Sequence, residues 1–404
     1  MTCANEMVRD DITMMKEEIR RRILEVTERS GDLSDADIQE LIDDEIIALE
    51  KSAKMAYEVR KKLRREIFYA IRKLDILQEL LETPEITEIM INGTDSIFIE
   101  RGGRLELCEF CFDSKEKLAN VIQQIVADCN RTVNEASPIV DARLQSGALV
   151  NVVLAPVALN GPIVTIRRFP EEPIRMDDLL AYGSLSPQMA DFLEGAVRQG
   201  ESIIVSGGTG SGKTTFLNVL SNFIPGHERI ITIEDSAELQ ILGIPNIVKL
   251  ETRGSNVEGC KEITIRDLIK TALRMRPDRI VVGEVRGSEA IDLLQAMNTG
   301  HPGSMSTIHA NHAKDMMSRL ETMVLMGTPL PLIAIRKQIA SGIQLIVQLG
   351  RLSDSSRRVI EIARIKGVVG DDIAIETLYK LHEEGEEPSG RLRVSWEFSN
   401  RECR

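Results

Sequence analysis

The chain has 404 residues, of which 43% are apolar, 28% are charged and only 3% are aromatic. This length and apolar content predict about two to four folded domains and exclude a disordered chain or a small disulfide-stapled protein. The 63 acidic side chains outnumber the 50 basic ones, and the net charge of −13 disfavours binding of the whole molecule to nucleic acid or an anionic membrane.

The N-terminus is charged and lacks the apolar core of a secretory signal, and no stretch of about 18 apolar residues occurs. We therefore expect a cytoplasmic protein without direct membrane insertion. Its six scattered cysteines are expected to be reduced thiols. Cys108 and Cys111 have C-x-x-C spacing in a strand-like run that would place them on opposite faces, and no second pair or histidine lies nearby, so zinc or redox use is disfavoured.

The first 75 residues form a compositional zone of their own, with 18 acidic and 15 basic side chains. Apolar residues such as Ile38, Ile42 and Ile46 recur at helical spacing, and Gly31 supplies a break between helices. This pattern predicts an N-terminal helical bundle or arm over residues 1–75. Residues 60–65 are strongly basic, but Leu63 and Ile67 lie at helical spacing among and after them. This pattern favours a solvated helix face over a membrane or nucleic-acid site.

Between residues 76 and 168, short β-like runs surround one helix-like segment, LANVIQQIVADCN, which predicts an α+β domain. Two prolines among charged residues follow without periodicity, so we interpret residues 169–184 as a linker. Helices then alternate with apolar strands such as IIVS and RIVVG. This alternation predicts an α/β domain over residues 185–404 with a largely parallel sheet.

A strand-like run at residues 202–206 leads into the glycine-rich sequence GGTGSGKTT and then into a helical pattern. This is Gly-x-x-x-x-Gly-Lys-Thr, the phosphate-binding loop (P-loop), in its required strand–loop–helix context. Glycines let the loop curl its amides around phosphates, and the helix N-terminus adds N–H groups and a positive dipole end. We expect Lys213 to contact the β- and γ-phosphates and Thr214 to bind Mg²⁺. The predicted nucleotide-binding residues are Gly208, Thr209, Gly210, Ser211, Gly212, Lys213, Thr214 and Thr215.

Two later apolar strands end in carboxylates, with residues 230–233 before Glu234 and residues 279–283 before Glu284. In a parallel sheet both strand ends open on the edge that carries the P-loop. A carboxylate there can hold Mg²⁺ or orient the attacking water, although a strand-terminal acid can also cap a helix. The combination with the loop favours a catalytic role, and the sequence leaves open which glutamate activates water.

Three of the five histidines lie within residues 300–312, in the sequence GHPGSMSTIHANH. A strand ending at His309 could place an imidazole beside the γ-phosphate as a sensor. A metal site is less favoured because clustered cysteines or carboxylates are missing. For His301, a buried structural histidine is a serious alternative.

Together these motifs resemble the secretion ATPase superfamily that powers type II and type IV secretion and type IV pili, and specifically its CpaF/TadA-type branch for Flp (Tad) pilus assembly. The resemblance runs from about residue 77 to 349 and rests on the stretches EITEIMING, SPIVDARL, NGPIVTIRRF, GGTGSGKTT, TIEDSAEL, RMRPDRIVVGEVRG and GHPGSMSTIHAN. It implies hexameric ring ATPases with a PAS-like N-terminal domain and a RecA-like P-loop NTPase domain.

The resemblance also assigns roles to individual residues. It places Glu234 in the "Asp box", Glu284 in an unusual Walker B, and His301 and His309 in the "His box". It matches Arg143, Arg167 and Arg168 to arginines that the family brings to the nucleotide from the N-terminal domain and linker. One departure is that relatives commonly read Gly-Ser-Arg-Val-Asn where this chain has Gly147-Ala-Leu-Val-Asn, so position 149 offers no arginine.

We therefore expect an ATP- and Mg²⁺-dependent homo-hexameric motor for Tad pilus assembly or related secretion, cytoplasmic and bound to the membrane through polytopic platform proteins. Glu284 and Glu234 would position or activate the attacking water, and Thr214 and Glu284 would bind the metal. Arg167 and Arg168 would stabilise the transferring phosphoryl group, with His309 as a catalytic sensor. Arg143 and His301 would contact the nucleotide. The alternatives are a RecA-like nucleic-acid motor, disfavoured by charge and few aromatics, and a nucleotide-gated scaffold. Cargo, direction of the motor and ring symmetry are left open.

Overall fold

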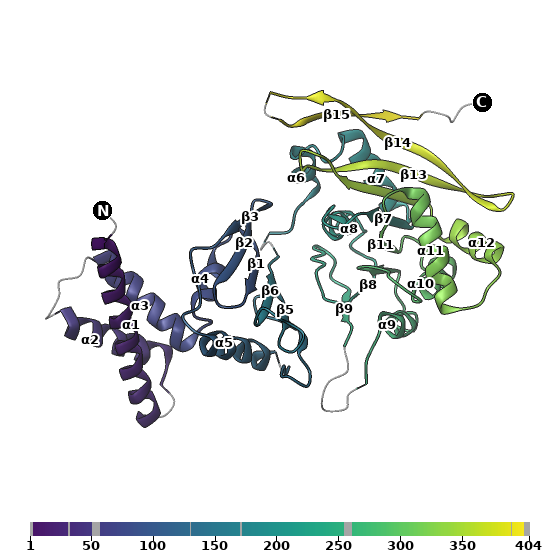
Figure 1. Cartoon of the computed structure of the whole chain (residues 1–404). Helices are drawn as coiled ribbons and strands as arrows, with labels where there is room; N and C mark the ends of the chain where they lie inside the picture. Colours follow the sequence, from purple (N-terminus) through teal and green to yellow (C-terminus); the bar gives the residue numbers. More distant parts are fainter. Residues whose placement is uncertain are drawn as a thin grey trace. The chain divides into compact units, whose positions relative to one another are not determined.

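The computed structural model describes residues 3–30, 33–50, 57–129, 131–169, 172–253, 261–388 and 390–399. The chain forms two compact units, Met1–Pro170 and Glu171–Arg404, and each has hydrophobic cores of its own (Figure 1). No helix in these described ranges is both long enough and apolar enough to cross a membrane.

The N-terminal unit begins with three helices, α1 (Cys3–Ser30), α2 (Asp35–Glu50) and α3 (Tyr57–Arg72). They pack around a small core made by Ile19, Ile23, Ile38, Ile42, Ile46, Leu63, Ile67 and Phe68. On α3, Leu63 is buried while Lys61 and Lys62 are exposed, so the basic run covers the solvated side of the helix. The predicted N-terminal helical region is confirmed.

An α+β fold follows, in which two helices cover one face of an antiparallel sheet. Its helices are α4 (Ile76–Glu82) and α5 (Lys115–Asp128), and Ser114 caps α5 by accepting a hydrogen bond from the Lys117 amide. Its strands are β1 (Ile86–Asn92), β2 (Ser96–Arg101), β3 (Arg104–Leu107), β4 (Ile139–Arg143), β5 (Leu149–Val153) and β6 (Ile163–Arg167). They lie in the order β3-β2-β1-β6-β5-β4.

Burial alternates along the central strands β1, β5 and β6, because one face packs on α4 and α5 and the other does not. The cysteine pair is not arranged as predicted. Strand β3 ends at Leu107, so Cys108 and Cys111 follow it; Cys108 is half-buried against the core and Cys111 is exposed.

The C-terminal unit is built on a nine-stranded sheet with the order β15-β14-β13-β12-β7-β11-β10-β8-β9. The strands are β7 (Ile203–Gly207), β8 (Ile230–Glu234), β9 (Ile247–Glu251), β10 (Arg279–Val282), β11 (Met305–His309), β12 (Leu345–Arg351), β13 (Arg357–Val369), β14 (Asp372–Glu386) and β15 (Leu392–Phe398). The helices are α6 (Met176–Ala181), α7 (Pro187–Arg198), α8 (Lys213–Ser221), α9 (Ile265–Ala272), α10 (Ala290–Asn298), α11 (Ala313–Gly327) and α12 (Leu332–Gly342).

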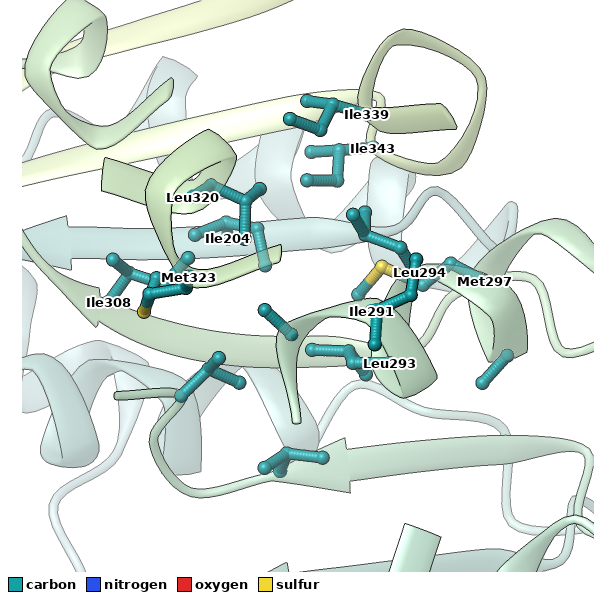
Figure 2. Close-up of a cluster of buried hydrophobic side chains, with 14 of the residues drawn as sticks. Ile204, Ile291, Leu293, Leu294, Met297, Ile308, Leu320, Met323, Ile339 and Ile343 are labelled. Atoms are coloured by element: carbon teal, nitrogen blue, oxygen red, sulfur yellow. The ribbon is translucent and has the colours of Figure 1, made fainter. Parts of the chain in front are cut away.

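Helices cover both faces of the parallel part of this sheet. Side chains of α9, α10, α11 and α12 pack on one face, and Figure 2 shows part of this core, with Ile204 and Ile308 of the strands against Leu294 and Leu320 of the helices. Side chains of α6, α7 and α8 pack on the other face. Strands buried on both faces explain the continuous apolar runs in the sequence.

Two features of this unit differ from the sequence prediction. The largely parallel sheet is found for the six strands from β12 to β9, but β13, β14 and β15 add antiparallel strands (Figure 1). Short turns join these three strands, so no crossover helix marked them in the sequence. The segment 169–184, interpreted as a linker, contains helix α6, whose Leu179 is buried in the core of the C-terminal unit.

Candidate nucleotide site

The P-loop joins a fully buried strand, β7, to the N-terminus of α8. Gly210 and Gly212 have φ values of 71° and 90°, in the left-handed region that glycine adopts without strain. Gly207 is required for close packing, because a Cβ there would lie 2.4 Å from Ser211 Oγ and 2.9 Å from the Leu349 carbonyl oxygen. The sequence therefore uses glycine where the loop turns and where it crosses β12.

Hydrogen-bond donors of the loop converge on one oxygen, the carbonyl of Gly208. Ser211 donates to it from Oγ (2.9 Å) and from its amide (3.4 Å), and Lys213 donates from Nζ (3.0 Å). The first amides of α8 add donors without a partner four residues earlier in the helix, together with the positive dipole end. Inward donors around a helix N-terminus form an arrangement that binds phosphate groups.

Lys213, His309 and Glu284 form a contact chain at this edge of the sheet. Lys213 Nζ lies 3.4 Å from His309 Nδ1, and His309 Nε2 lies 2.9 Å from Glu284 Oε1. The residues come from the start of α8, the end of β11 and the segment just after β10. Because β7, β11, β10 and β8 run parallel, their carboxyl ends share one edge, as the sequence predicts.

The surroundings of His309 favour its neutral form. Burial lowers the pKa of His309, and the positive charges of Lys213 and Arg286 lower it further, although Glu284 opposes them. A neutral imidazole carries one N–H. Since the Lys213 ammonium can only donate, Nδ1 is the acceptor and Nε2 carries the proton. Nε2 lies 2.9 Å from Glu284 Oε1, although this oxygen accepts no hydrogen bond from the described residues. Burial likewise lowers the pKa of Lys213.

Arg286 adds a further contact to Glu284, through the carboxylate oxygen that does not face His309. It donates to Glu284 Oε2 at 2.7 Å, and its other terminal nitrogen lies 3.7 Å from Asp235 Oδ2. The hydrogen bond to Glu284 is the main reason that the pKa of Arg286 is raised. Arg286 and Asp235 lie in the sequence stretches GEVRG and IEDS, but the sequence alone did not assign either of them to the site. The structure does so through the contacts of Arg286 with Glu284 and Asp235.

Glu234 is a second carboxylate at this edge, and it is 2% exposed. Its Oε2 accepts hydrogen bonds from the amides of Glu238 (2.8 Å) and Leu239 (3.0 Å), while Oε1 has no hydrogen-bond partner among the described residues. Burial raises the pKa of Glu234 to about 7, although the two hydrogen bonds act in the opposite direction and lower it. Gly283 makes room for it, because a Cβ there would lie 3.0 Å from Glu234 Cγ. A carboxyl with this pKa suits proton transfer near neutral pH.

The oxygen atoms at this edge are suitable ligands for a magnesium ion that arrives with a nucleotide. Thr214 offers a hydroxyl in the first turn of α8. Glu284 and Glu234 offer carboxylate oxygens, and Oε1 of each is buried without a hydrogen-bond partner among the described residues. Mg²⁺ prefers such oxygen donors and takes its other ligands from phosphates and water. In the described part of the chain, no group of three or more His, Cys, Asp or Glu residues could hold a metal by itself.

His301 does not lie with these residues. It precedes β11, at the amino end of the strand, whereas the P-loop follows the carboxyl end of the parallel neighbour β7. The rise along β11 alone separates the two edges by about 13 Å. His301 was expected to contact the nucleotide, but the structure places it at the opposite edge of the sheet from the P-loop of its own chain. Its carbonyl accepts a hydrogen bond from Ser304, whereas its ring Nδ1 is buried without a hydrogen-bond partner among the described residues, so a hydrogen-bonded structural histidine is not what the structure shows either.

The three predicted arginines belong to the N-terminal unit. Arg143 and Arg167 are exposed and both are cross-strand partners of Leu149, so the three residues form a row across β4, β5 and β6. Arg167 lies 3.7 Å from Glu88. Arg168 instead donates to the carbonyl oxygens of Ile86 (2.9 Å) and Thr83, which ties β6 to the start of β1.

Residues 71–390 match the family described as Type II/IV secretion system protein. The chain belongs to this family. A Mycobacterium tuberculosis protein whose name refers to conjugal transfer is 35% identical over 301 residues, which cover 73% of this chain and 85% of that protein. The type IV secretion system protein PtlH of Bordetella pertussis is 34% identical over 320 residues, covering 72% and 93%.

This membership confirms the resemblance to the secretion ATPase superfamily. Among solved structures, the pilus retraction motor PilT with bound ADP has a TM-score of 0.52 at 22% identity, and the match covers 76% of this chain and 82% of that one. At this identity the likeness concerns the fold. It agrees with an N-terminal domain followed by a RecA-like ATPase domain, and the predicted fold class is confirmed.

Proposed function

We propose that this secretion-system family member hydrolyses ATP at the P-loop edge of its C-terminal unit. The observation that supports the proposal is the contact chain from Lys213 through His309 to Glu284. It joins the phosphate-binding lysine to a strand-end carboxylate, beside a loop whose donors point inward. A glycine-rich turn without catalytic function would not need these charged groups to meet.

In the proposed reaction, Lys213 leaves the Gly208 carbonyl and donates to the β- and γ-phosphates. Gly208, Thr209, Gly210, Ser211, Gly212 and Thr215 complete the loop and the first helical turn around them. Glu284, held by His309 and Arg286, orients the attacking water, and Glu234 accepts a proton because burial raises its pKa to about 7. Thr214 and Glu284 would hold Mg²⁺, which supplies neutralising charge to the phosphates.

We also propose that the N-terminal unit contributes positive charge to this reaction. Arg143 and Arg167 suit this role because they are exposed in one row of the sheet. The contacts of Arg168 within its own unit favour a positioning role for it. The segment between the units would then hinge as nucleotide is bound and released.

At the level of the assembly, we propose a homo-hexamer that powers Tad pilus assembly or related type II/IV secretion at the cytoplasmic face of the membrane. The family match and the conjugal-transfer and type IV secretion relatives support such a machine. Polytopic platform proteins would be its partners. Analytical ultracentrifugation with a non-hydrolysable ATP analogue and co-purification with membrane proteins encoded nearby test these two statements.

The test of the core proposal is ATP binding and turnover by the full chain and by Lys213→Ala. We expect binding and turnover to be lost in this variant, since the lysine supplies the charge that holds the phosphates. Lys314→Ala, on an exposed turn of α11, is the matched control and should behave as the unaltered chain does. ATPase activity retained by Lys213→Ala would overturn the site, and turnover that depends on added DNA would favour a nucleic-acid motor.

A further inference from the structure

Arg357, the first residue of β13, contacts the outer side of the P-loop. Its Nε donates to the carbonyl oxygen of Gly210 at 2.9 Å. Its Cδ would lie 3.4 Å from a Cβ placed on Gly212, so the arginine stem also covers the glycine that precedes α8. No motif points to this residue, which lies in a C-terminal hairpin far along the chain from the loop.

This hydrogen bond fixes the orientation of one peptide group of the loop. In a trans peptide the carbonyl and the next N–H point in opposite directions. With the Gly210 carbonyl turned outward to Arg357, the Ser211 amide points inward, where it joins Ser211 Oγ and Lys213 Nζ at the Gly208 oxygen. Gly210 has little conformational preference of its own, so this peptide can rotate easily unless something holds it.

The hairpin that carries Arg357 is itself held firmly. The turn between β12 and β13 is closed by two hydrogen bonds: the Leu352 amide donates to the Ser356 carbonyl, and the Ser355 amide donates to the Leu352 carbonyl. Asp354 accepts hydrogen bonds from Ser356 and from the Leu392 amide of β15 (2.9 Å). Burial opposes the charge on Asp354, yet these bonds outweigh it and lower the pKa to about 2. A charged anchor at neutral pH therefore keeps the turn in place.

The next residue of β13 is held as well. Arg358 is 4% exposed and donates to the carbonyl oxygens of Gly183 and Tyr182, at the end of α6. The Val359 amide donates to the Ser184 carbonyl at 2.8 Å. Positive charge at a helix C-terminus is favourable. Successive side chains of a strand point to opposite faces, so Arg358 anchors the strand while Arg357 is presented to the loop.

We propose that Arg357 is a positioning residue for the nucleotide, which keeps the Gly210–Ser211 peptide turned so that the Ser211 amide faces the phosphates. This inference rests on the proposed ATPase function. An amide that contacts phosphate in both the ground state and the transition state contributes uniform binding. Its loss raises KM and leaves kcat nearly unchanged.

The experiment compares Arg357→Ala, Arg357→Lys and Arg351→Ala in the full chain. Arg351 is the cross-strand partner of Arg357 at the end of β12 and is also an exposed arginine. Within the described ranges the structure records no contact between Arg351 and the loop. Steady-state ATPase kinetics give KM and kcat, and titration with ADP gives a Kd that does not depend on turnover. Thermal unfolding followed through Trp396 reports whether the unit remains folded.

We expect Arg357→Ala to raise KM for ATP and Kd for ADP roughly three- to tenfold, the value of one hydrogen bond, with kcat within about twofold. Lysine at this position should restore part of the affinity, and Arg351→Ala should match the unaltered chain. Unchanged affinity in Arg357→Ala, or an equal loss in Arg351→Ala, would overturn the inference. Failure of the ATPase proposal is distinguishable, because the unaltered chain would then not hydrolyse ATP, or Lys213→Ala would bind and hydrolyse it as the unaltered chain does.

Discussion

His309 Nε2 and Glu284 Oε1 lie 2.9 Å apart, although His309 ends β11 and Glu284 follows β10. On its other side, His309 Nδ1 faces the ammonium of Lys213 at 3.4 Å. The neutral imidazole thus stands between a cation and an anion that would otherwise attract each other directly. In the proposed reaction, this spacing would keep Lys213 available for phosphates and Glu284 available for water.

Replacing His309 with Ala should therefore lower kcat by about 10- to 100-fold. Without the imidazole, Lys213 and Glu284 can form a direct ion pair, which competes with phosphate binding and turns the carboxylate away from water. Steady-state ATPase kinetics measure the effect. His312→Ala is the matched control, because His312 is exposed just before α11 and should tolerate the change. A His309→Ala variant with normal kcat would show that the contact chain is not needed for turnover.

Glu284→Gln should bind ATP but hydrolyse it on the order of 100- to 1000-fold more slowly. The amide keeps the size of the side chain and removes the charge that orients water and metal. Binding of a fluorescent ATP analogue and single-turnover hydrolysis separate the two steps. If turnover remains near normal, the water-activating role moves to Glu234.

Glu234 should give the reaction a pH dependence near neutrality. Its pKa is raised to about 7 by burial, so the ionised form that accepts a proton becomes populated as the pH rises through 7. We expect kcat to increase from pH 6 to pH 8 in the unaltered chain. Glu234→Gln should be slower and should lose this dependence. An identical pH profile in both proteins would assign the titration to another group.

The same shift predicts that Glu234 lowers stability at high pH. A carboxyl whose pKa is about 7 when folded and 4.5 when unfolded stabilises the fold fully below pH 4.5, and this contribution is lost as the pH rises through 7. The difference corresponds to about 3 kcal/mol. Glu234→Gln should therefore unfold at a higher temperature than the unaltered chain at pH 8, and the gain should shrink toward pH 5. Trp396 fluorescence follows this unit, because its indole donates to Val359 of β13. An equal effect at both pH values would contradict the prediction.

The P-loop and the two strand-end glutamates were predictable because each follows a short apolar β-branched run at a fixed spacing. Parallel pairing of such strands places their carboxyl ends together without further information. The contact of His309 with Lys213 depends on the order in which β11 falls between β7 and β10, and no local pattern encodes that order. His301 was assigned to the nucleotide through the family resemblance, although the strand predicted to end at His309 already places the two histidines at opposite ends of that strand.

Arg357 could not be predicted at all, because it reaches Gly210 through the antiparallel strands that follow β12. These strands carry alternating and irregular patterns rather than the buried runs of a parallel sheet, so their pairing partners were not visible. Helix α6 was missed because six residues after two prolines give too short a periodic pattern. The contact between Arg357 and Gly210 joins residues 147 positions apart, whereas α6 was missed for this local reason.

Arg168→Ala should destabilise the N-terminal unit by about 1–3 kcal/mol, since the carbonyls of Thr83 and Ile86 lose a charged donor. Arg167→Ala, at the neighbouring exposed position, should leave stability unchanged while it lowers ATP turnover. Hydrogen exchange at β1 and β6 measures the first effect, and Trp396 fluorescence should show an unaltered C-terminal unit in both variants. If Arg168→Ala keeps full protection of β1 but loses turnover, Arg168 acts on the nucleotide rather than on the fold.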